Sequence, residues 1–596
     1  MKGCTKMKKM LVLFVVILAL SISSTMSFAQ TESKGDTLII GPYNSEGEPL
    51  GALNEALKAD TTEAGERIHK VYKLQRKAQY ILTEIIKIDF PLVLVADAPD
   101  AENRPPVIRC GVKSDGGNVA EWWHIFDDAT FVNLWISGIN LNGVGPIGWI
   151  SQTVNATGKT ITYTGCTLEF PYTYWAMFND PGGLNDYIIT DCVFKNIGNP
   201  SGTTWNGAIF HSGNADTVLI RNTTFFNFGC FAAKGAFYQV IDHCTFVNSV
   251  VHPVESHEQV IKIFTNNLFV NGHAFSDDDD EIKRHFDQEV KGLMNYAEIQ
   301  FDPQALDSLY GPGGIYGKDW DPDGDGTCTH ADLVWELKNN AWFYTDPVVN
   351  YWAEWPNVTP NPWMNNYNKA MFENKEGPWT WSVWSYVRDT ADVIIDSTEV
   401  TVNHQPFKYF VEENTMNVDP GIVDMNNTDE LLAQNCDNIR NEWAGETVEH
   451  VKWHNVENYL AFTWPFDFDL SYTNATLKTA GTDGKPVGSL QWWDEFEYTD
   501  VANTSAPTPE RFDLKQNYPN PFNPTTNISY SLSKKSHVEI KVYNLLGAEV
   551  ATLVDEYKEA GNFNIVFDSS DLASGVYFYQ LKAGDKTMTR KMMLMK

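Results

Sequence analysis

The chain has 596 residues, of which 43% are hydrophobic, and this is enough for several domains with large cores. Its 44 lysines and arginines against 77 aspartates and glutamates give a formal net charge of −33. A surface of this sign repels phosphate backbones and anionic headgroups, so we expect neither a nucleic-acid partner nor a membrane-surface partner. It also disfavours a highly anionic polysaccharide unless calcium intervenes.

The N-terminus has the features of an export signal. Lysines at four of the first nine positions precede an apolar run over residues 10–20, and Ser27-Phe-Ala29 places small residues where a signal peptidase cleaves. The run is shorter than the roughly 20 residues that a membrane-spanning helix needs. We therefore predict a signal peptide over 1–29 and no membrane span in the mature protein.

Residues 30–110 fit an N-terminal cap followed by the first strands of a repeated structure. Leu53 and Leu57, followed by the acidic stretch 63–66, predict a short helix, and residues 71–74 and 88–95 predict opening strands. A solenoid needs such a lid because its terminal strand would otherwise pair with other chains.

Residues 111–275 repeat a pattern in which apolar positions 1 and 3 are followed by Cys, Thr, Asn or Ile at position 6 and Phe or Leu at position 8. The six copies are Leu134, Ile136, Ile139, Leu141; Ile161, Tyr163, Cys166, Leu168; Tyr187, Ile189, Cys192, Phe194; Val218, Ile220, Thr223, Phe225; Gln239, Ile241, Cys244, Phe246; and Lys262, Phe264, Asn267, Phe269. Two short strands joined by a bend, recurring at intervals of 21 to 31 residues, predict a solenoid whose coils bury each other's inner faces.

Two further columns accompany these copies. Asparagines at 196, 227, 248 and 271 follow the phenylalanine by two residues and predict a stacked ladder at a corner, because asparagine tolerates left-handed backbone. Cysteines 166, 192 and 244 share the sixth position, where we expect stacked small hydrophobic side chains and not disulfides or metal ligands. Lys195 is expected on the surface.

These copies resemble the right-handed parallel β-helix of the pectate-lyase-like proteins. A β-propeller would need four strands over ~40 to 45 residues per blade, which this spacing does not provide. The resemblance implies a mainly β fold in which ligands bind outside the coil, because its interior is filled by side chains. Residues 417–424 and 472–488 resemble closing segments of secreted β-helix proteins, so we predict a closing segment over 417–498.

Residues 276–416 are predicted to form an insertion that contains an EF-hand-like calcium loop. Acidic residues at the first, third, fifth and twelfth positions of 321–332, with glycine at the sixth, can gather oxygen ligands around a hard cation. The predicted ligands are Asp321, Asp323, Asp325, Thr327, Thr329 and Asp332. Leu333, Val334 and Leu337 have the spacing of an exiting helix. The alternative is a solvated Asp/Gly turn without metal.

No catalytic residue is identified by a motif. A lyase needs a base and a cation beside the sugar carboxylate. Six residues on or near neighbouring coils could supply them: Arg221, Lys234, Asp242, His243, Glu255 and His257. Solenoid exteriors commonly carry such residues. The 20 tryptophans suggest carbohydrate binding, because aromatic faces stack on sugar rings. They include Trp122, Trp123, Trp135, Trp149, Trp352, Trp355, Trp363, Trp379, Trp381 and Trp384.

The C-terminal residues 512–596 follow a linker over 499–511 and are predicted to form a small immunoglobulin-like β-sandwich. Alternating apolar positions mark its strands at 528–532, 538–542 and 563–567. The stretches 516–525, 542–550, 572–577 and 591–596 resemble the C-terminal (type A) sorting domain of type IX secretion cargo. This resemblance implies contact with the type IX secretion machinery and delivery to the cell surface or the medium.

The leading hypothesis is a non-enzymatic, secreted or cell-surface β-helix protein that binds polysaccharide or another surface ligand. One alternative is a calcium-dependent polysaccharide lyase or glycoside hydrolase that uses an external groove. The other is a structural adhesin or surface-layer component.

Overall fold

The computed structural model describes most of the chain after residue 30. The described residues are 31–41, 50–113, 116–139, 150–169, 176–180, 183–197, 208–212, 215–229, 232–234, 236–250, 253–257, 260–276, 294–296, 308–314, 318, 320–321, 326–329, 332–355, 358, 360, 362–364, 369–370, 373–374, 378–388, 394–404, 407–443, 446–448, 462–493, 513–514, 522, 524–532, 535–544, 548–558, 561–570, 572, 575–584 and 586–594. The predicted signal peptide and linker lie outside them. The chain divides into two compact units, Met1–Glu497 and Tyr498–Lys596.

Within the described residues, the first unit consists mainly of three long sheets. Sheet 1 has 12 described strands in the order β1 (Thr31–Lys34), β2 (Thr37–Ile40), β3 (Val71–Leu74), β6 (Leu92–Ala96), β9 (Ala129–Val132), β12 (Thr160–Thr164), β15 (Asp186–Thr190), β18 (Ala215–Arg221), β21 (Ala236–Asp242), β24 (Ile261–Thr265), β27 (Val334–Lys338) and β31 (Tyr409–Glu413). Apart from the antiparallel β1–β2 pair, its neighbouring strands run parallel.

Sheets 2 and 3 are also parallel. Sheet 2 has 10 described strands: β4 (Gln79–Leu82), β7 (Val107–Cys110), β10 (Trp135–Ser137), β13 (Thr167–Glu169), β16 (Val193–Ile197), β19 (Thr224–Phe228), β22 (Thr245–Ser249), β25 (Leu268–Val270), β28 (Ala341–Phe343) and β32 (Met416–Asn417). Sheet 3 is described in two parts: β5 (Ile86–Ile88), β8 (Trp123–Ile125), β11 (Ile150–Val154), β14 (Ala176–Asn179) and β17 (Ala208–Ser212), then β20 (Ala232–Lys234), β23 (Val254–His257) and β26 (Met294–Tyr296).

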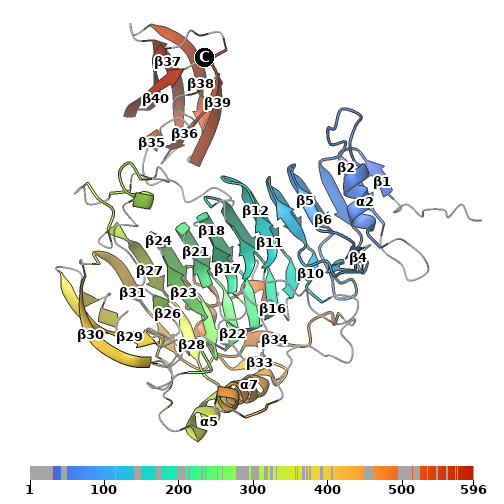
Figure 1. Ribbon diagram of the computed structural model, residues 1–596, viewed down its shortest axis with the longest axis vertical. Coiled ribbons are helices and arrows are strands. Elements are labelled where there is room, and N and C mark those ends of the chain that lie inside the picture. The colour runs from blue at the N-terminus through green and yellow to red at the C-terminus, as the bar shows by residue number, and fades with distance from the viewer. Residues whose placement is uncertain are drawn as a thin grey trace, which may run out of the picture. The chain divides into compact units, whose positions relative to one another are not determined.

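From β3 to β26 each turn of the chain adds one strand to each sheet, so strands three apart in sequence are neighbours there (Figure 1). These long parallel sheets are consistent with a parallel β-helix. The predicted repeat is confirmed in five of its six copies, because Tyr187 aligns with Ile161 and Val218, and Phe225 aligns with Phe194 and Phe246. The sequence pattern did not reveal the third strand of each coil.

The first copy of the predicted repeat needs correction. Ala129 and Phe131, not Leu134 and Ile136, align with Ile161 and Tyr163. Ile136 instead aligns with Leu168 in sheet 2. The shift arises because the alternation of apolar residues continues through this bend, so the pattern fits at two positions.

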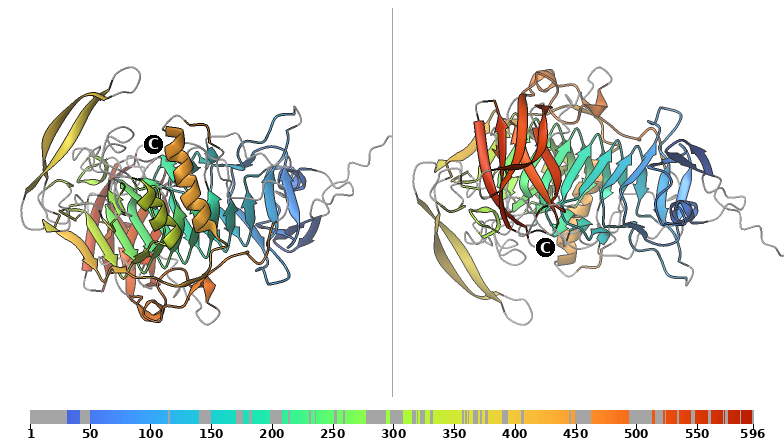
Figure 2. Two further views of the ribbon diagram at one scale, coloured as in Figure 1. Left: turned by 90° about the horizontal axis from the view of Figure 1, so that it is seen from below. Right: turned by 90° about the horizontal axis from the view of Figure 1, so that it is seen from above.

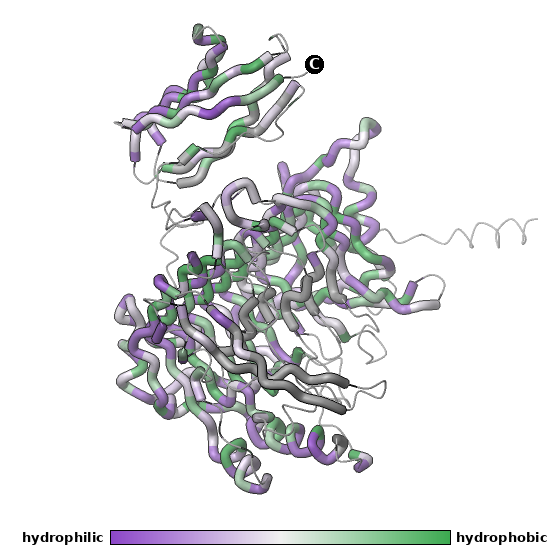
Figure 3. Tube along the Cα trace, turned by 60° about the vertical axis from the view of Figure 1, so that its left-hand side comes forward, coloured by the Kyte–Doolittle hydropathy of each residue, from purple (hydrophilic) through white to green (hydrophobic). Residues whose placement is uncertain are grey.

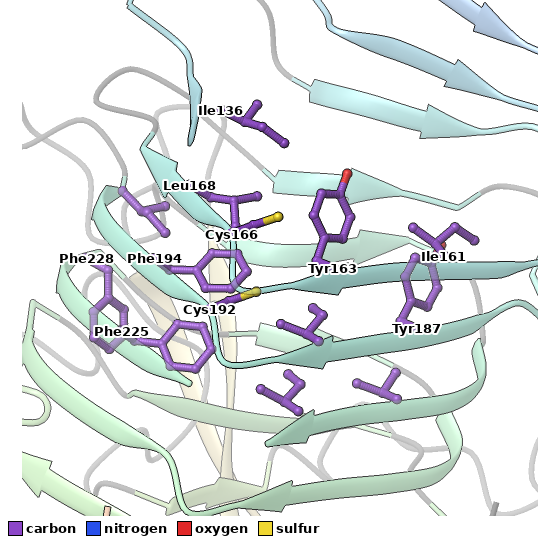
Figure 4. Close-up of a cluster of buried hydrophobic side chains, with 14 of the residues drawn as sticks. Ile136, Ile161, Tyr163, Cys166, Leu168, Tyr187, Cys192, Phe194, Phe225 and Phe228 are labelled. Atoms are coloured by element: carbon purple, nitrogen blue, oxygen red, sulfur yellow. The ribbon is translucent and has the colours of Figure 1, made fainter. Parts of the chain in front are cut away.

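Side chains from the inner faces fill the coil. Phe246 stacks between Phe225 and Phe269, with ring centroids 4.7 Å from each. Figure 4 shows Phe194 and Phe225 beside Cys166 and Cys192. Cys166, Cys192 and Cys244 are buried and carry free thiols, as expected for stacked small hydrophobic side chains.

Asparagines form the predicted ladder at the C-terminal ends of the sheet 2 strands, within β16, β19 and β22 and directly after β25. Asn196, Asn227, Asn248 and Asn271 all have left-handed backbone, with φ between 54° and 60°. Nδ2 of Asn248 donates to Oδ1 of Asn227 at 3.0 Å, and Nδ2 of Asn271 donates to Oδ1 of Asn248 at 3.0 Å. Each side chain therefore links its coil to the preceding one.

Helices and a hairpin surround the coils (Figure 2). The short helix expected around Leu53 and Leu57 is α2 (Ala52–Ala59), which buries both side chains against the first coil. The further helices are α5 (Asp346–Glu354) and α7 (Thr428–Trp443), and β29 (Trp379–Arg388) pairs with β30 (Ile394–His404). None of the helices in the described part of the chain is long and apolar enough to cross a membrane.

The predicted insertion over 276–416 also needs correction, because β27, β28 and β31 from this range continue sheets 1 and 2. Leu333, Val334 and Leu337 therefore do not form an exiting helix, and that prediction is wrong. Val334 and Leu337 lie in β27, which is held between β24 and β31. Parallel pairing on both sides outweighs the helical spacing of three apolar residues.

The last described part of the predicted closing segment, residues 462–493, returns along the outside of the coils, and the name closing segment is used below for these residues. It contains β34 (Asp469–Tyr472), which pairs antiparallel with β33 (Ile422–Asp424), and the short 3-10 helices η3 (Leu477–Thr479) and η4 (Leu490–Trp492). Its apolar side chains share a second core with the outer face of sheet 2.

The C-terminal unit contains two antiparallel sheets around one core. One sheet has β35 (Asp513–Leu514), β36 (Thr525–Leu532) and β39 (Gly561–Asp568), and the other has β38 (Glu549–Lys558), β37 (Ser536–Asn544), β40 (Gly575–Ala583) and β41 (Lys586–Leu594). Ile528, Ile540 and Phe567 are buried, as the alternation predicts. Figure 3 shows hydrophobic residues along the strands of both units.

Candidate functional site

Polar residues gather at the bend between sheets 1 and 2, where β21 ends. The Asp242 carboxylate accepts hydrogen bonds from Thr265 Oγ1 at 2.7 Å and Asn266 Nδ2 at 2.8 Å. His243 follows in left-handed backbone, with φ of 50°. Its Nδ1 lies 3.2 Å from Asp242 Oδ2, and its Nε2 lies 3.4 Å from Asp483 Oδ1 of the closing segment.

This Asp242–His243–Asp483 cluster favours the protonated imidazole. Burial opposes the charge, but the hydrogen bonds and charges of both carboxylates raise the pKa of His243 to about 9. His243 in turn lowers the pKa of Asp483 to about 2 and also lowers the pKa of Asp242, although burial opposes both shifts. Only 3% of the His243 side chain is exposed. A buried imidazolium cannot accept a proton at neutral pH, so this cluster works better as a clamp than as a general base.

The six polar residues considered for catalysis fall in two places. Arg221 and Asp242 are register partners at the ends of β18 and β21, and His243 follows directly. Lys234 and His257 are partners on β20 and β23 in sheet 3, with Glu255 two residues before His257. The chain therefore divides the set between two sheets and does not form the single cluster that sequence proximity suggested.

The loop over 321–332 is described in part, and Asp323 and Asp325 lie outside the described residues. Asp321 Oδ2 accepts from the Gly326 backbone N–H at 3.0 Å, which closes the turn. The Asp332 side chain is buried, and its Oδ2 accepts from the Thr329 backbone N–H at 2.8 Å and from Thr329 Oγ1 at 3.3 Å. Thr327 is half-buried. Among the described residues alone, no group of three His, Cys, Asp or Glu side chains could hold a metal ion.

Many of the tryptophans are core residues. Trp122, Trp123, Trp135, Trp352 and Trp363 are buried. Trp355 is half-buried, and its Nε1 donates to Asp437 Oδ1 at 3.0 Å. Trp379, Trp381 and Trp384 lie in β29, whereas Trp149 lies outside the described residues. The tryptophans in the first coils therefore do not form an open sugar-binding face.

The outer face of sheet 2 combines charges and aromatic rings in a way that the sequence did not reveal. In one outward column, Ile81 of β4 is followed by four polar residues and then by four apolar residues. The polar half is Arg109, Ser137, Glu169 and Lys195, and the apolar half is Phe226, Val247, Val270 and Phe343.

Rings surround the polar half. Lys195 Nζ lies 4.8 Å from the Trp135 ring centroid and 3.6 Å from Glu169 Oε1. Trp135 Nε1 donates to Glu169 Oε2 at 3.3 Å. The Arg109 guanidinium lies 5.3 Å from the Phe462 ring centroid, and its Nε donates to the Ile139 carbonyl at 2.8 Å.

The closing segment covers both halves. Phe462, Trp464 and Phe466 place their rings within 6.5 Å of Trp135, between centroids. Phe468 stacks on Phe226 at 4.2 Å over the apolar half. Sequence reasoning missed this cover, although the alternation Phe462-Thr-Trp-Pro-Phe-Asp-Phe468 is a visible signal that one side of an extended segment faces an apolar surface.

Comparison with known proteins identifies one matching region. A family described as the secretion system C-terminal sorting domain matches residues 516–595. The chain thus carries a type IX secretion tail, which indicates a secreted or cell-surface protein and implies an interaction with the type IX secretion machinery. A search of curated proteins gives no match to the chain.

Proposed function

We propose that this is a non-enzymatic surface or secreted protein that binds polysaccharide through its coiled unit. The observation that carries the proposal is the row of half-buried rings Phe462, Trp464 and Phe466, which lie over Trp135 and Lys195, on a chain with an export tail. Aromatic faces pack on sugar rings, and charged side chains beside them bind hydroxyl or carboxyl groups.

Two finer assignments belong to this proposal. The coiled unit is a right-handed parallel β-helix of the pectate-lyase-like type, which is supported by its three parallel sheets. The loop over 321–332 binds a calcium ion that holds this part of the chain to the coils, which is supported by the closed Asp321–Gly326 turn. The partly exposed Asp321 and the acidic residues beside it would supply hard oxygen ligands.

The charge state of the His243 cluster disfavours general-base catalysis there. A lyase base must be neutral before it removes a proton, and two carboxylates hold this imidazole in its charged form. A structural adhesin remains the competing function, since it would use the same export tail without a glycan ligand.

The test is a glycan array probed with the purified mature chain, followed by calorimetric titration of each glycan that binds. Saturable binding to one class of glycan is expected. Binding to none would contradict the proposal and favour the adhesin. Appearance of ultraviolet-absorbing unsaturated products from uronic-acid polymers would instead establish a lyase.

A second experiment tests export. Removal of residues 512–596 should leave the coiled unit folded in the periplasm and abolish delivery by an active type IX machine. Delivery of the truncated chain to the surface or the medium would contradict the role assigned to the tail.

A further inference from the structure

A chain of three hydrogen-bonded side chains lies at the N-terminal end of the coils, apart from the surfaces described above. Ser33 Oγ lies 2.7 Å from His69 Nε2, and His69 Nδ1 lies 2.6 Å from Asp60 Oδ1. The order is hydroxyl, imidazole and carboxylate, with one ring nitrogen facing each oxygen. This is the arrangement by which a histidine activates a serine for attack on an acyl group.

Three separate elements bring these side chains together. Asp60 directly follows α2, His69 lies two residues before β3, and Ser33 lies in β1. The strand β2 connects them, because it pairs antiparallel with β1 and parallel with β3 (Figure 1). Ser33 and His69 are 36 positions apart in sequence. Their contact therefore depends on the fold.

Asp60 is a buried, charged group that orients the imidazole. The Tyr72 hydroxyl donates to Asp60 Oδ2 at 2.7 Å, and the His69 backbone N–H donates to the same oxygen at 3.1 Å. Burial raises the pKa of Asp60, but the hydrogen bonds from Tyr72 and His69 outweigh burial and lower it. Burial and the Asp60 carboxylate raise the pKa of Tyr72, so its hydroxyl remains a donor.

The charged carboxylate determines which ring nitrogen of His69 can act as a base. A carboxylate only accepts hydrogen bonds, so Nδ1 carries a proton toward Asp60. In the neutral imidazole, Nε2 is then the acceptor, and it faces the Ser33 hydroxyl. His243 differs, because carboxylates lie beside both of its ring nitrogens and stabilise its charge.

The two ends of this chain of side chains differ in exposure. His69 is 8% exposed and Asp60 is 4% exposed, whereas all four residues of β1, including Ser33, are exposed. A hydrogen bond to an exposed hydroxyl adds little stability, because water competes for it. A buried imidazole and carboxylate directed at an exposed serine instead place an activated nucleophile within reach of a molecule from solvent.

We propose that Ser33, His69 and Asp60 form a triad that makes Ser33 a site of covalent acylation by a carboxylic ester. Ser33 is the nucleophile, His69 is the base, and Asp60 orients the imidazole and stabilises its protonated form. This inference goes beyond the polysaccharide binding proposed for the coiled unit and uses different residues.

The acylation step is balanced by two proton transfers through His69. Ser33 Oγ bonds to the carbonyl carbon of the ester while its proton moves to His69 Nε2. The bond from that carbon to the alcohol oxygen then breaks, and the alcohol leaves with the proton from Nε2. One ester is broken and one ester, on Ser33, is formed, so the step needs no oxidant, reductant or further reactant.

The experiment treats the full mature chain with p-nitrophenyl acetate and, separately, with a fluorophosphonate that labels activated serines. Mass spectrometry of peptides locates the label, and absorbance follows release of p-nitrophenolate. Ser33→Ala removes the nucleophile and His69→Asn removes the base. Thr31→Ala is the matched control, because it removes another exposed hydroxyl from the same strand.

The wild type and Thr31→Ala should become labelled on Ser33 at equal rates. Ser33→Ala should carry no label on this peptide and, because Ser33 is exposed, should keep the fold. His69→Asn should slow labelling about a hundredfold or more, the usual contribution of a general base. If His69→Asn unfolds, the wild type in urea replaces it, since unfolding separates the three side chains and should slow labelling by a similar factor.

Three results would overturn the inference: no label on Ser33 in the wild type, equal rates in the wild type and His69→Asn, or a rate that urea does not change. Equal slowing in Thr31→Ala and His69→Asn would also overturn it. None of these results depends on glycan binding, so either proposal can fail alone. Release of p-nitrophenolate beyond one equivalent per chain, lost in Ser33→Ala, would support the triad and contradict the non-enzymatic part of the proposed function.

Discussion

Residues 462–466 and residues 468–493 lie on the same sheet but are held by different forces. The first part packs rings against Trp135 and three cations, Arg104, Arg109 and Lys195. The second part buries Phe468 and Leu470, pairs β34 with β33, and hydrogen-bonds to the bends of the coils. The difference separates two roles of one segment, because only the second part has the apolar burial and backbone pairing that stabilise a fold.

The largest loss of stability is expected from a substitution inside the coil. Losses from substitutions in the two parts of the closing segment can be compared with it. Phe246→Ala should lower the free energy of unfolding by about 3–5 kcal/mol, because the ring lies between two others and leaves a cavity. Urea denaturation of the coiled unit measures this. Lys70→Ala, at an exposed side chain, should change little. Equal losses would contradict the inner stack.

The comparison of the two parts predicts that alanine substitutions of two phenylalanines, one in each part, lower the free energy of unfolding by different amounts. Phe468→Ala should cost about 2–4 kcal/mol, because its buried ring stacks on Phe226. Phe466→Ala should cost less, since that ring is half-buried over charged residues. Hydrogen exchange should also be faster in 462–466 than in β34. The reverse order in either measurement would remove the distinction between the two parts.

Alkaline pH should weaken the attachment of residues 468–493 to the coils, because His243 then loses the charge that attracts Asp483. The folded-state pKa of His243 is about 9, above the ordinary value of 6.5, so its stabilisation is complete below about pH 6.5 and is lost as pH rises through 9. His243→Asn keeps a residue that tolerates left-handed backbone, as Asn222 and Asn266 do in neighbouring coils.

The free energy of unfolding of the wild type should therefore exceed that of His243→Asn by about 1–2 kcal/mol at pH 6. This difference should be smaller at pH 10. Partial exposure of Asp483 places the gap toward the lower end of this range. Its lowered pKa, about 2, means that the carboxylate contribution is lost only as pH falls through 2. A gap that stays constant from pH 6 to pH 10 would contradict the clamp.

The smallest effect concerns calcium, which should stabilise the 321–332 loop without changing the contrast between the two parts of the cover. Calcium at ten times its dissociation constant should add about 1.4 kcal/mol. Asp323→Ala with Asp325→Ala should abolish that increase, as followed by melting temperature. No calcium binding by the wild type at millimolar concentration would rule out the metal site. Faster exchange in 462–466 after calcium removal would link the loop to the cover.

The sequence predicted the inner faces of the coils well because their signal is local and repeated. Phe225 and Phe246 fall at the same position of a pattern, so the register follows from the sequence alone. The corner asparagines were predictable for the same reason. The first copy was misplaced because Leu134 continues the apolar alternation on the wrong side of a bend.

The candidate site could not be predicted in this way because it depends on contacts between distant segments. Lys195 alternates with the inward Phe194 and is therefore expected in solvent, yet Phe466, 271 positions later, covers it. His243 likewise acquires its second carboxylate from Asp483. Periodicity identifies the two faces of a strand, but it does not identify the segment that covers the outer one.

The final part of the closing segment has a consequence for the length of the stack. Described hydrogen bonds join residues 480–491 to the bends of successive coils, from Asn339 through Asn266, Thr245 and Asn222 to Cys192. Loss of one coil would shorten the stack by about 4.8 Å and place each later donor opposite the wrong bend. The number of coils beside this segment is therefore fixed by its hydrogen bonds. Loops between strands can lengthen without disturbing these bonds, but addition or deletion of a single coil would break them.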